Sequence, residues 1–124
     1  MDPVKVLVCD DAVLYATLLE SWFRDAPEVD VVGTASTGRE ALEKAGALEP
    51  DMVVLDHLLP DGVSEELAPR LRERLPGVRI VLVSGLADDA LAAAAGAIDA
   101  DAWVRKASDQ DAIRGAILRG AGRR

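Results

Sequence analysis

Short apolar runs alternate with helical patterns along the whole chain. Five such runs are found at Lys5–Cys9, Val29–Ala35, Asp51–Leu55, Arg79–Val83 and Ala102–Arg105. Most are rich in Val, Leu and Ile and almost uninterrupted by polar residues, which is typical of parallel strands covered on both faces. The pattern therefore predicts five strands in one parallel sheet.

The segments between these runs have the periodicity of amphipathic helices. The predicted helices are Ala12–Arg24, Gly38–Leu48, Glu65–Leu75, Asp88–Ile98 and Asp109–Leu118. Three- and four-residue spacing places large apolar residues on one face of the first helix: Tyr15, Leu18, Leu19, Trp22 and Phe23. The last helix likewise has Ile113 and Ile117 on its inner face. Five successive strand–helix units predict an α/β sandwich whose parallel strands are joined by right-handed crossovers.

The ends and interiors of the helices carry further signals. Thr37-x-x-Glu40 is a capping box at the start of the second helix, and Ser108 is the expected N-cap of the fifth. Pro69 removes one backbone hydrogen bond from the third helix, which is expected either to begin late or to be kinked. The fourth helix contains Gly96 and an alanine run with little side chain to bury. We expect the fourth helix to be the least anchored element.

Composition narrows the class of protein. The chain has 124 residues, 50% of them hydrophobic, which fits one domain over residues 1–124 and excludes disorder as the default state. A single cysteine, Cys9, excludes a disulfide framework, and a net charge of -8 disfavours direct contact with nucleic acid. No signal-peptide pattern or long apolar run is present, so we expect a cytoplasmic domain with no membrane contact. The Gly-Ala-Gly-Arg-Arg ending is expected to be a tail or the start of a linker.

Polar residues immediately follow several of the predicted strands. Asp10 and Asp11 follow the first strand, Asp56 the third, Ser84 the fourth and Lys106 the fifth. Ligands of an open parallel sheet bind beyond the carboxyl ends of its strands, so these side chains are expected to converge at one edge. Taken singly, the aspartates fit a helix N-cap, the serine a turn and the lysine a surface amine. Their joint occurrence favours a shared site.

The residue types in this set match the requirements of phosphoryl transfer. Three clustered carboxylates repel one another, and a hard divalent cation such as Mg²⁺ relieves that repulsion. With the charge neutralised, one carboxylate can act as a nucleophile on phosphorus and form an aspartyl phosphate. The metal, an ammonium group and a hydroxyl group can then hold the phosphoryl oxygens.

Four motifs, VLVCDD, VVLDHLLPDG, VLVSG and WVRKAS, occur in this order and resemble the receiver domain of two-component response regulators over essentially the whole chain. The resemblance implies a flavodoxin-like fold similar to that of the chemotaxis regulator. In that fold a five-stranded parallel sheet of order 2-1-3-4-5 is flanked by five helices in a three-layer sandwich. It also implies that Asp56 is the phosphoacceptor. Asp11, Asp56 and the backbone carbonyl of Leu58 would bind Mg²⁺ directly, and Asp10 would act through a metal-bound water.

The resemblance assigns roles to four further residues. Ser84 and Lys106 would contact the phosphoryl group, Gly85 would leave room for it, and Trp103 would be the switch aromatic. The family's usual Lys-Pro pair is replaced here by Lys106-Ala107, which predicts a trans peptide bond and an altered loop.

Two residues beside the acids are interpreted as structural. His57 follows Asp56 in a strand and should point to the opposite face, away from the metal, although a pH-modulating role is the alternative. Cys9 is expected to be a buried apolar thiol.

The resemblance implies a signalling switch and not an enzyme. A histidine kinase or phosphotransfer protein would phosphorylate Asp56. The face formed by the fourth helix, fifth strand and fifth helix would then change its affinity for an output protein or a second copy. A small Mg-dependent phosphatase is disfavoured because Leu58 stands where a second acid is usually needed. A phosphorylation-independent interaction module is disfavoured because every key position is filled. The kinase, the output partner, the oligomeric state and any DNA-binding domain beyond Arg124 stay open.

Overall fold

The computed structural model describes residues 2–122. The strands are β1 (Val4–Cys9), β2 (Val29–Ala35), β3 (Met52–Asp56), β4 (Leu58–Leu59), β5 (Gly62–Val63), β6 (Arg79–Ser84) and β7 (Ala102–Arg105). The helices are α1 (Val13–Phe23), α2 (Gly38–Leu48), α3 (Ser64–Arg74), α4 (Asp88–Ala97) and α5 (Gln110–Gly120). Within residues 2–122, none of these helices is long and apolar enough to cross a membrane.

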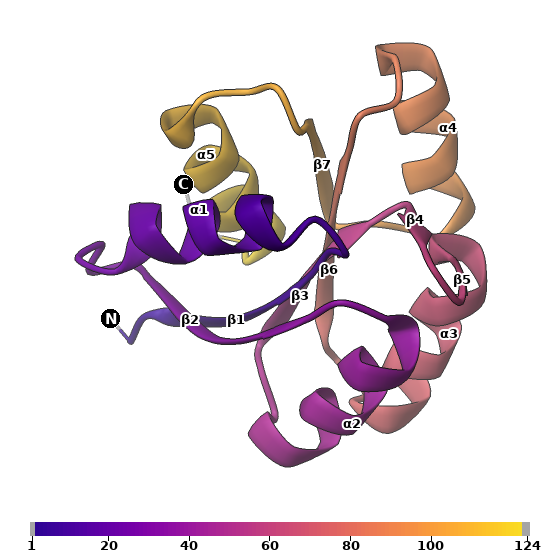
Figure 1. Cartoon of the computed structure of the whole chain (residues 1–124), viewed down its shortest axis with the longest axis horizontal. Helices are drawn as coiled ribbons and strands as arrows, with labels where there is room; N and C mark the ends of the chain where they lie inside the picture. The colour runs from indigo at the N-terminus through magenta and orange to yellow at the C-terminus, as the bar shows by residue number, and fades with distance from the viewer. Residues whose placement is uncertain (1, 123–124) are drawn as a thin grey trace.

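Five strands form one parallel sheet in the order β2-β1-β3-β6-β7 (Figure 1). Counted along the chain without the short β4 and β5, this is the expected order 2-1-3-4-5, so the fold class is confirmed. The order reverses between β1 and β3, which places the carboxyl ends of these two strands side by side. A crevice at such a reversal is where ligands of this type of sheet bind.

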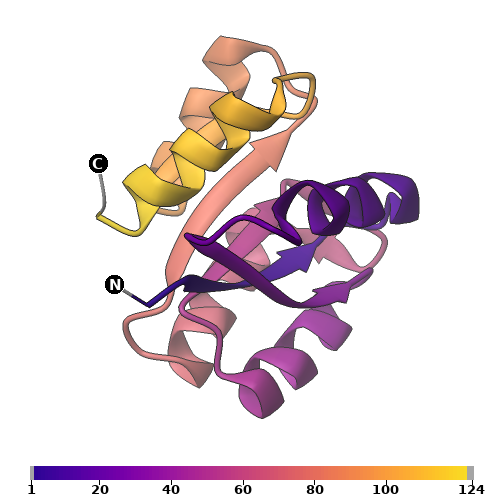
Figure 2. The same ribbon diagram turned by 90° about the vertical axis from the view of Figure 1, so that its left-hand side faces the viewer.

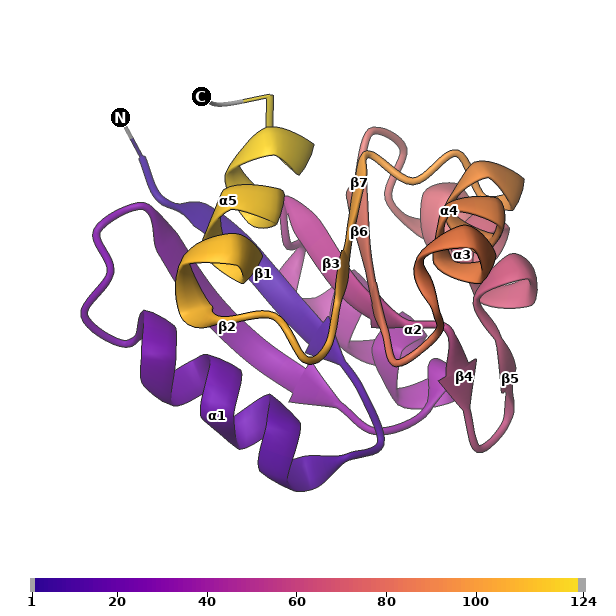
Figure 3. The same ribbon diagram turned by 90° about the horizontal axis from the view of Figure 1, so that it is seen from above.

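The helices cover both faces of the sheet, as Figures 2 and 3 show from the side and from above. Helices α1 and α5 pack on one face, where buried Leu19, Phe23, Ile113 and Ile117 share a core cluster with the strands. Helices α2, α3 and α4 pack on the other face around a second cluster. Because the strands are buried on both sides, they carry the uninterrupted apolar runs seen in the sequence.

The predicted boundaries hold to within two residues, with specific corrections at helix ends. The N-cap of α5 is Asp109, whose side chain accepts a hydrogen bond from the Ala112 N–H at 2.9 Å, so the assignment to Ser108 was wrong. The same helix continues to Gly120, which is buried, so Gly120 is not part of a tail. Arg123 and Arg124, the end of that expected tail, lie outside the described residues. Leu18, expected on the inner face of α1, is 40% exposed.

The third helix and the loop before it differ from expectation. Helix α3 begins at Ser64 and contains Pro69, so the alternative of a late start was wrong. The residues between β3 and α3 form a small antiparallel ladder in which Leu58 pairs with Val63 and Leu59 with Gly62. The sequence pattern did not predict this ladder, because two-residue strands are too short to show any periodicity.

Helix α4 has the fewest attachments to the core. Only Leu91 and Ala95 of this helix are buried. After the helix, Asp99 adopts a left-handed backbone conformation with φ of 50°, a position where glycine would cost less. The weak anchoring expected for this segment is therefore visible in its burial.

Two helical glycines allow a matched test of the packing. A Cβ at Gly120 would lie 2.6 Å from Val81 Cγ2, whereas a Cβ at Gly96 would meet nothing within 4 Å. We expect Gly120→Ala to lower the free energy of unfolding by about 1–3 kcal/mol through overpacking. Gly96→Ala should raise it by about 0.5–1 kcal/mol because alanine is the better helix former. Chemical denaturation measures both, and equal effects at the two positions would contradict the packing described for α5.

Candidate functional site

The carboxyl ends of the central strands bring polar side chains together at one edge of the sheet. Asp56 ends β3 opposite Val83 of β6, and Asp10 directly follows β1. The Lys106 N–H donates to the Ser84 carbonyl at 2.9 Å, which keeps the ends of β6 and β7 level. Asp10 and Asp56 are only 4% and 8% exposed. Two carboxylates are therefore held, largely out of water, at the reversal of strand order.

The Lys106 ammonium group lies between these two carboxylates. Its Nζ is 2.7 Å from Asp10 Oδ2 and 3.3 Å from Asp56 Oδ2. Burial works to lower the pKa of Lys106, but the hydrogen bond that Lys106 donates to Asp10 and the charge of Asp56 outweigh it, so the pKa lies above its usual value. Burial, and then repulsion by Asp10, raises the pKa of Asp56 despite the opposing effect of Lys106. The Lys106 ammonium group thus relieves only part of the electrostatic repulsion between the two carboxylates.

A third carboxylate completes a set of donors suited to a hard cation. One oxygen from each of Asp10, Asp11 and Asp56 lies within 4.8 Å of the others. Asp10 also accepts a hydrogen bond from the Ala12 N–H at 2.8 Å, so it helps to begin α1 as well. Carboxylate oxygens at the mouth of a crevice, with too little positive charge to balance them, fit a divalent cation such as Mg²⁺. The cluster could hold a metal.

The loop that carries Leu58 is anchored at two points. Ser64 N–H donates to the His57 carbonyl and its Oγ lies 2.9 Å from His57 Nδ1, which closes the loop at its base. Halfway along, Asp61 accepts hydrogen bonds from the Gly38 and Arg39 N–H groups at 2.8 and 3.0 Å. These bonds to the start of α2 lower the pKa of Asp61. Sequence reasoning missed both anchors, although the Pro60-Asp61-Gly62 turn marks where the second one lies.

Most of the residues predicted for the site line one hollow at the carboxyl edge of the sheet. Asp56, Leu58, Ser84, Gly85 and Lys106 line a hollow of about 580 Å³ at this edge. A Cβ at Gly85 would meet nothing within 4 Å, so the hollow is open beside it. Trp103 does not line the hollow.

The sequence analysis also assigned roles to Trp103, His57 and Cys9. Trp103 lies on β7, paired with Leu82, and is 48% exposed. The His57 ring bonds to Ser64 although it borders the same hollow as Asp56. Cys9 is fully buried as expected, and burial, then Asp10, raises its pKa to about 12. The expected trans geometry of Lys106-Ala107 is also found, since residues 2–122 contain no cis peptide bond.

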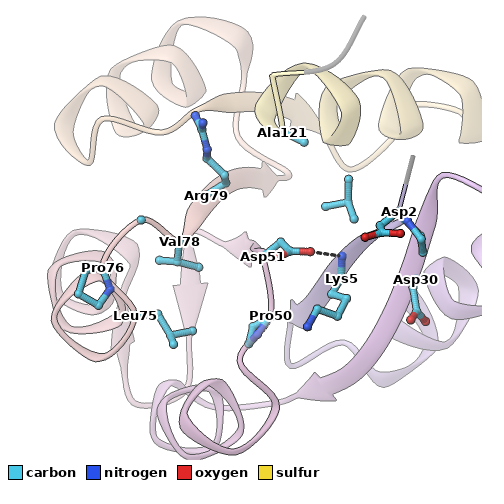
Figure 4. Close-up of a pocket in the computed structure, with 13 residues that line it drawn as sticks. Asp2, Lys5, Asp30, Pro50, Asp51, Leu75, Pro76, Val78, Arg79 and Ala121 are labelled. Atoms are coloured by element: carbon cyan, nitrogen blue, oxygen red, sulfur yellow. Dashed lines mark hydrogen bonds between the residues drawn. The ribbon is translucent and has the colours of Figure 1, made fainter.

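A second, larger hollow lies at the opposite edge of the sheet. It measures about 820 Å³, and Figure 4 shows Lys5, Asp30, Asp51 and Arg79 around it. Asp51 is already bonded to the Lys5 N–H at 2.9 Å. The part of the chain that the structure describes has its one potential metal cluster at Asp10, Asp11 and Asp56, not here. The candidate functional side chains are therefore found at the carboxyl edge of the sheet.

Comparison with known proteins places the chain in a family. The model of the response regulator receiver domain matches residues 6–118. The chain belongs to the response regulator receiver domains. It is 32% identical over 115 residues to the transcriptional regulatory protein LnrK of Bacillus subtilis, covering 93% of this chain and 52% of that protein. It is 31% identical over 87 residues to the response regulator VraR of Staphylococcus saprophyticus, covering 70% of this chain and 42% of that protein.

A solved receiver domain has the same fold over its whole length. The signal receiver domain of NarL from Mycobacterium tuberculosis is 29% identical, with a TM-score of 0.87 and complete coverage of both chains. The chain spans about half the length of the curated relatives VraR and LnrK. Membership of the family makes this a domain of two-component signal transduction.

The raised pKa of Asp56 generates a prediction about stability. A carboxyl group whose pKa is higher in the folded chain binds its proton more tightly there, so its charge opposes folding above that pKa. We expect Asp56→Asn to raise the free energy of unfolding at pH 7, and the gain to shrink as pH falls and the native carboxyl becomes protonated. Denaturation at several pH values measures this. The exposed Asp25→Asn is the control and should show no such gain; equal behaviour of the two variants would contradict the described electrostatics.

Proposed function

We propose that this domain is a phosphorylation-dependent switch in which Asp56 accepts a phosphoryl group from a histidine kinase or phosphotransfer protein. One observation carries the proposal: the Lys106 ammonium group contacts both Asp10 and Asp56 at 2.7 and 3.3 Å, within a cluster of three carboxylates. An ammonium group so placed can balance the charge of a phosphoryl group that enters at Asp56. A surface lysine or a helix cap would not require this arrangement.

The chain's own residues account for the steps of the transfer. An Asp56 oxygen forms a bond to phosphorus, the bond from phosphorus to the donor's histidine nitrogen breaks, and that nitrogen keeps the electron pair and takes a proton. Ser84 Oγ accepts from the Leu86 N–H at 3.2 Å, which leaves its own O–H free to donate to a phosphoryl oxygen. Lys106 offers a second donor. Held by Asp10, Asp11, Asp56 and the carbonyl of Leu58, Mg²⁺ would supply further positive charge.

We propose that phosphorylation alters the face formed by α4, β7 and α5, and that a partner recognises the altered face. Trp103 lies on this face, on the last strand of the sheet, where its indole has room to change rotamer. Arg105 and Asp88 form an exposed ion pair at 3.8 Å that joins β7 to α4. Such exposed pairs contribute little free energy, so α4 is free to shift at small cost. Phosphorylation would stabilise one of two arrangements of this face, and an output protein or a second copy of the chain would bind that one.

The proposal also covers where the domain acts, whether it is an enzyme and what it contacts. We propose that residues 1–124 act as one receiver domain in the cytoplasm and are not themselves an enzyme, because Leu58 leaves no second acid two residues after Asp56. With net charge -8, the domain itself is not suited to contact nucleic acid or an anionic membrane. LnrK is a transcriptional regulatory protein. A DNA-binding output would therefore lie in another domain or in a partner.

Labelling with a small phosphodonor tests the assignment of Asp56. Phosphoramidate and Mg²⁺ should add one phosphoryl group to the native domain, and Asp56→Asn should reduce this labelling at least about a hundredfold because the amide is a poor nucleophile. Intact-mass spectrometry measures the product. Asp30→Asn, at the opposite edge of the sheet, should react like the native chain, and excess chelator should stop the reaction. Undiminished labelling of folded Asp56→Asn would refute the proposal.

Hydrogen exchange tests the output face. Beryllofluoride with Mg²⁺ mimics the phosphoryl group and should change amide exchange most between Leu86 and Lys106, because α4 opens most easily. The same treatment should promote self-association or partner binding, measured by analytical ultracentrifugation. Asp56→Asn is the control and should not respond. If only the loops around Asp11 and Asp56 become protected, the proposal for the face of α4, β7 and α5 is refuted, and the partner must bind another face.

A further inference from the structure

An aromatic ring on α1 contacts the lysine of the site. The Lys106 Nζ lies over the face of Tyr15, 5.1 Å from the centre of the ring. This distance is within the range of a favourable cation–π interaction, which strengthens when the pair is shielded from water. Tyr15 is half-buried and Lys106 is only 24% exposed, so the contact is partly shielded. Within residues 2–122 the ammonium group therefore has three partners: two carboxylates and one ring.

The hydroxyl group of Tyr15 shows which part of the side chain is needed. Among the described residues, Tyr15 Oη is a buried polar atom without a hydrogen-bond partner. Burial, then the charges of Asp10 and Asp56, raises the pKa of Tyr15, so the phenol stays neutral. A buried hydroxyl without a partner destabilises a fold, and phenylalanine would avoid that cost. The ring, and not the hydroxyl, is the part that makes a specific contact.

We propose that Tyr15 is a positioning residue that acts through Lys106, holding the ammonium group where it meets the phosphoryl group on Asp56; this rests on the proposed function. Of the three partners of the ammonium group, Asp56 changes its charge when it becomes an acyl phosphate, and Asp10 is shared with the potential metal site. The ring has no charge to lose. Unlike Asp56, the ring is the same before and after phosphorylation, and unlike Asp10 it is not a potential metal ligand.

A simpler explanation is that Tyr15 only fills the core. It packs at the edge of the cluster between α1, α5 and the sheet, together with Trp22 of the same helix. Trp22 is also half-buried, but among the described residues the ring that lies against the Lys106 ammonium group is that of Tyr15 and not that of Trp22. Trp22→Leu therefore reproduces the loss of an aromatic ring from α1 without the loss of the ammonium contact, which makes it the matched control.

The experiment measures the rate constant of phosphorylation by phosphoramidate with saturating Mg²⁺. Tyr15→Leu should slow the reaction about three- to thirtyfold, the range expected from the loss of a cation–π contact. Tyr15→Phe, which keeps the ring, should restore the rate to within about twofold of the native value. Trp22→Leu should also stay within about twofold. In the Lys106→Met background, Tyr15→Leu should change the rate by less than about twofold, because no ammonium group remains to be positioned.

The outcomes separate this proposal from the proposed function. A native rate in Tyr15→Leu, or an equal loss with and without the Lys106 ammonium group, would show that the ring does not act through Lys106 and would overturn the proposal while leaving Asp56 as phosphoacceptor. A native chain that is not labelled at Asp56 would overturn both. If Tyr15→Leu does not fold, proton NMR of the native chain decides. The Lys106 methylene protons should be shifted upfield by the ring relative to Lys5 and Lys44, and an unshifted resonance would overturn the proposal.

Discussion

The balance of charge around Lys106 is the constraint on which the site depends. Two carboxylates, Asp10 and Asp56, are almost completely removed from water at the carboxyl edge of the sheet. Burial of like charges is costly, and a single ammonium group at 2.7 and 3.3 Å offsets it only in part, as the raised pKa of Asp56 shows. The negative charge at this edge is therefore only partly neutralised in the folded domain. This condition favours the binding of a cation beside the carboxylates.

The fold supplies that arrangement at low cost because its strands are fixed from both sides. One core cluster lies between the sheet and α1 and α5, and the other lies between the sheet and α2, α3 and α4. Asp56 and Ser84 are the last residues of β3 and β6, and Asp10 is the first residue after β1, so these packed strands fix where the three side chains begin. The energy for holding them together comes from burial of the apolar faces.

The sequence allowed the sheet, its order and the convergence of the acids to be predicted, because each rests on a repeated signal. Strand periodicity places Asp10, Asp56 and Lys106 at carboxyl ends, and parallel topology then brings them to one edge. What escaped prediction depends on contacts between distant segments. Asp61 bonds to the first amides of α2, and Tyr15 meets Lys106 across the sheet edge. No local pattern encodes such pairs. The capping of α5 by Asp109 and not by Ser108 was missed because neighbouring polar residues compete for one position.

The two anchors of the β3–α3 loop make the walls of the site unequal in stiffness. On that side, Asp61 attaches the loop to the positive end of the α2 dipole, and Ser64 closes its base against His57. On the other side, the Ser84 hydroxyl accepts a hydrogen bond from the Leu86 N–H two residues ahead, and α4 follows with few buried residues. Under the proposed function, a phosphoryl group on Asp56 would therefore meet a firmly anchored loop on one side and a weakly anchored segment on the other. Any rearrangement caused by that group would then be directed toward Ser84, Gly85 and α4, so the unequal anchoring would give the response of the domain a direction.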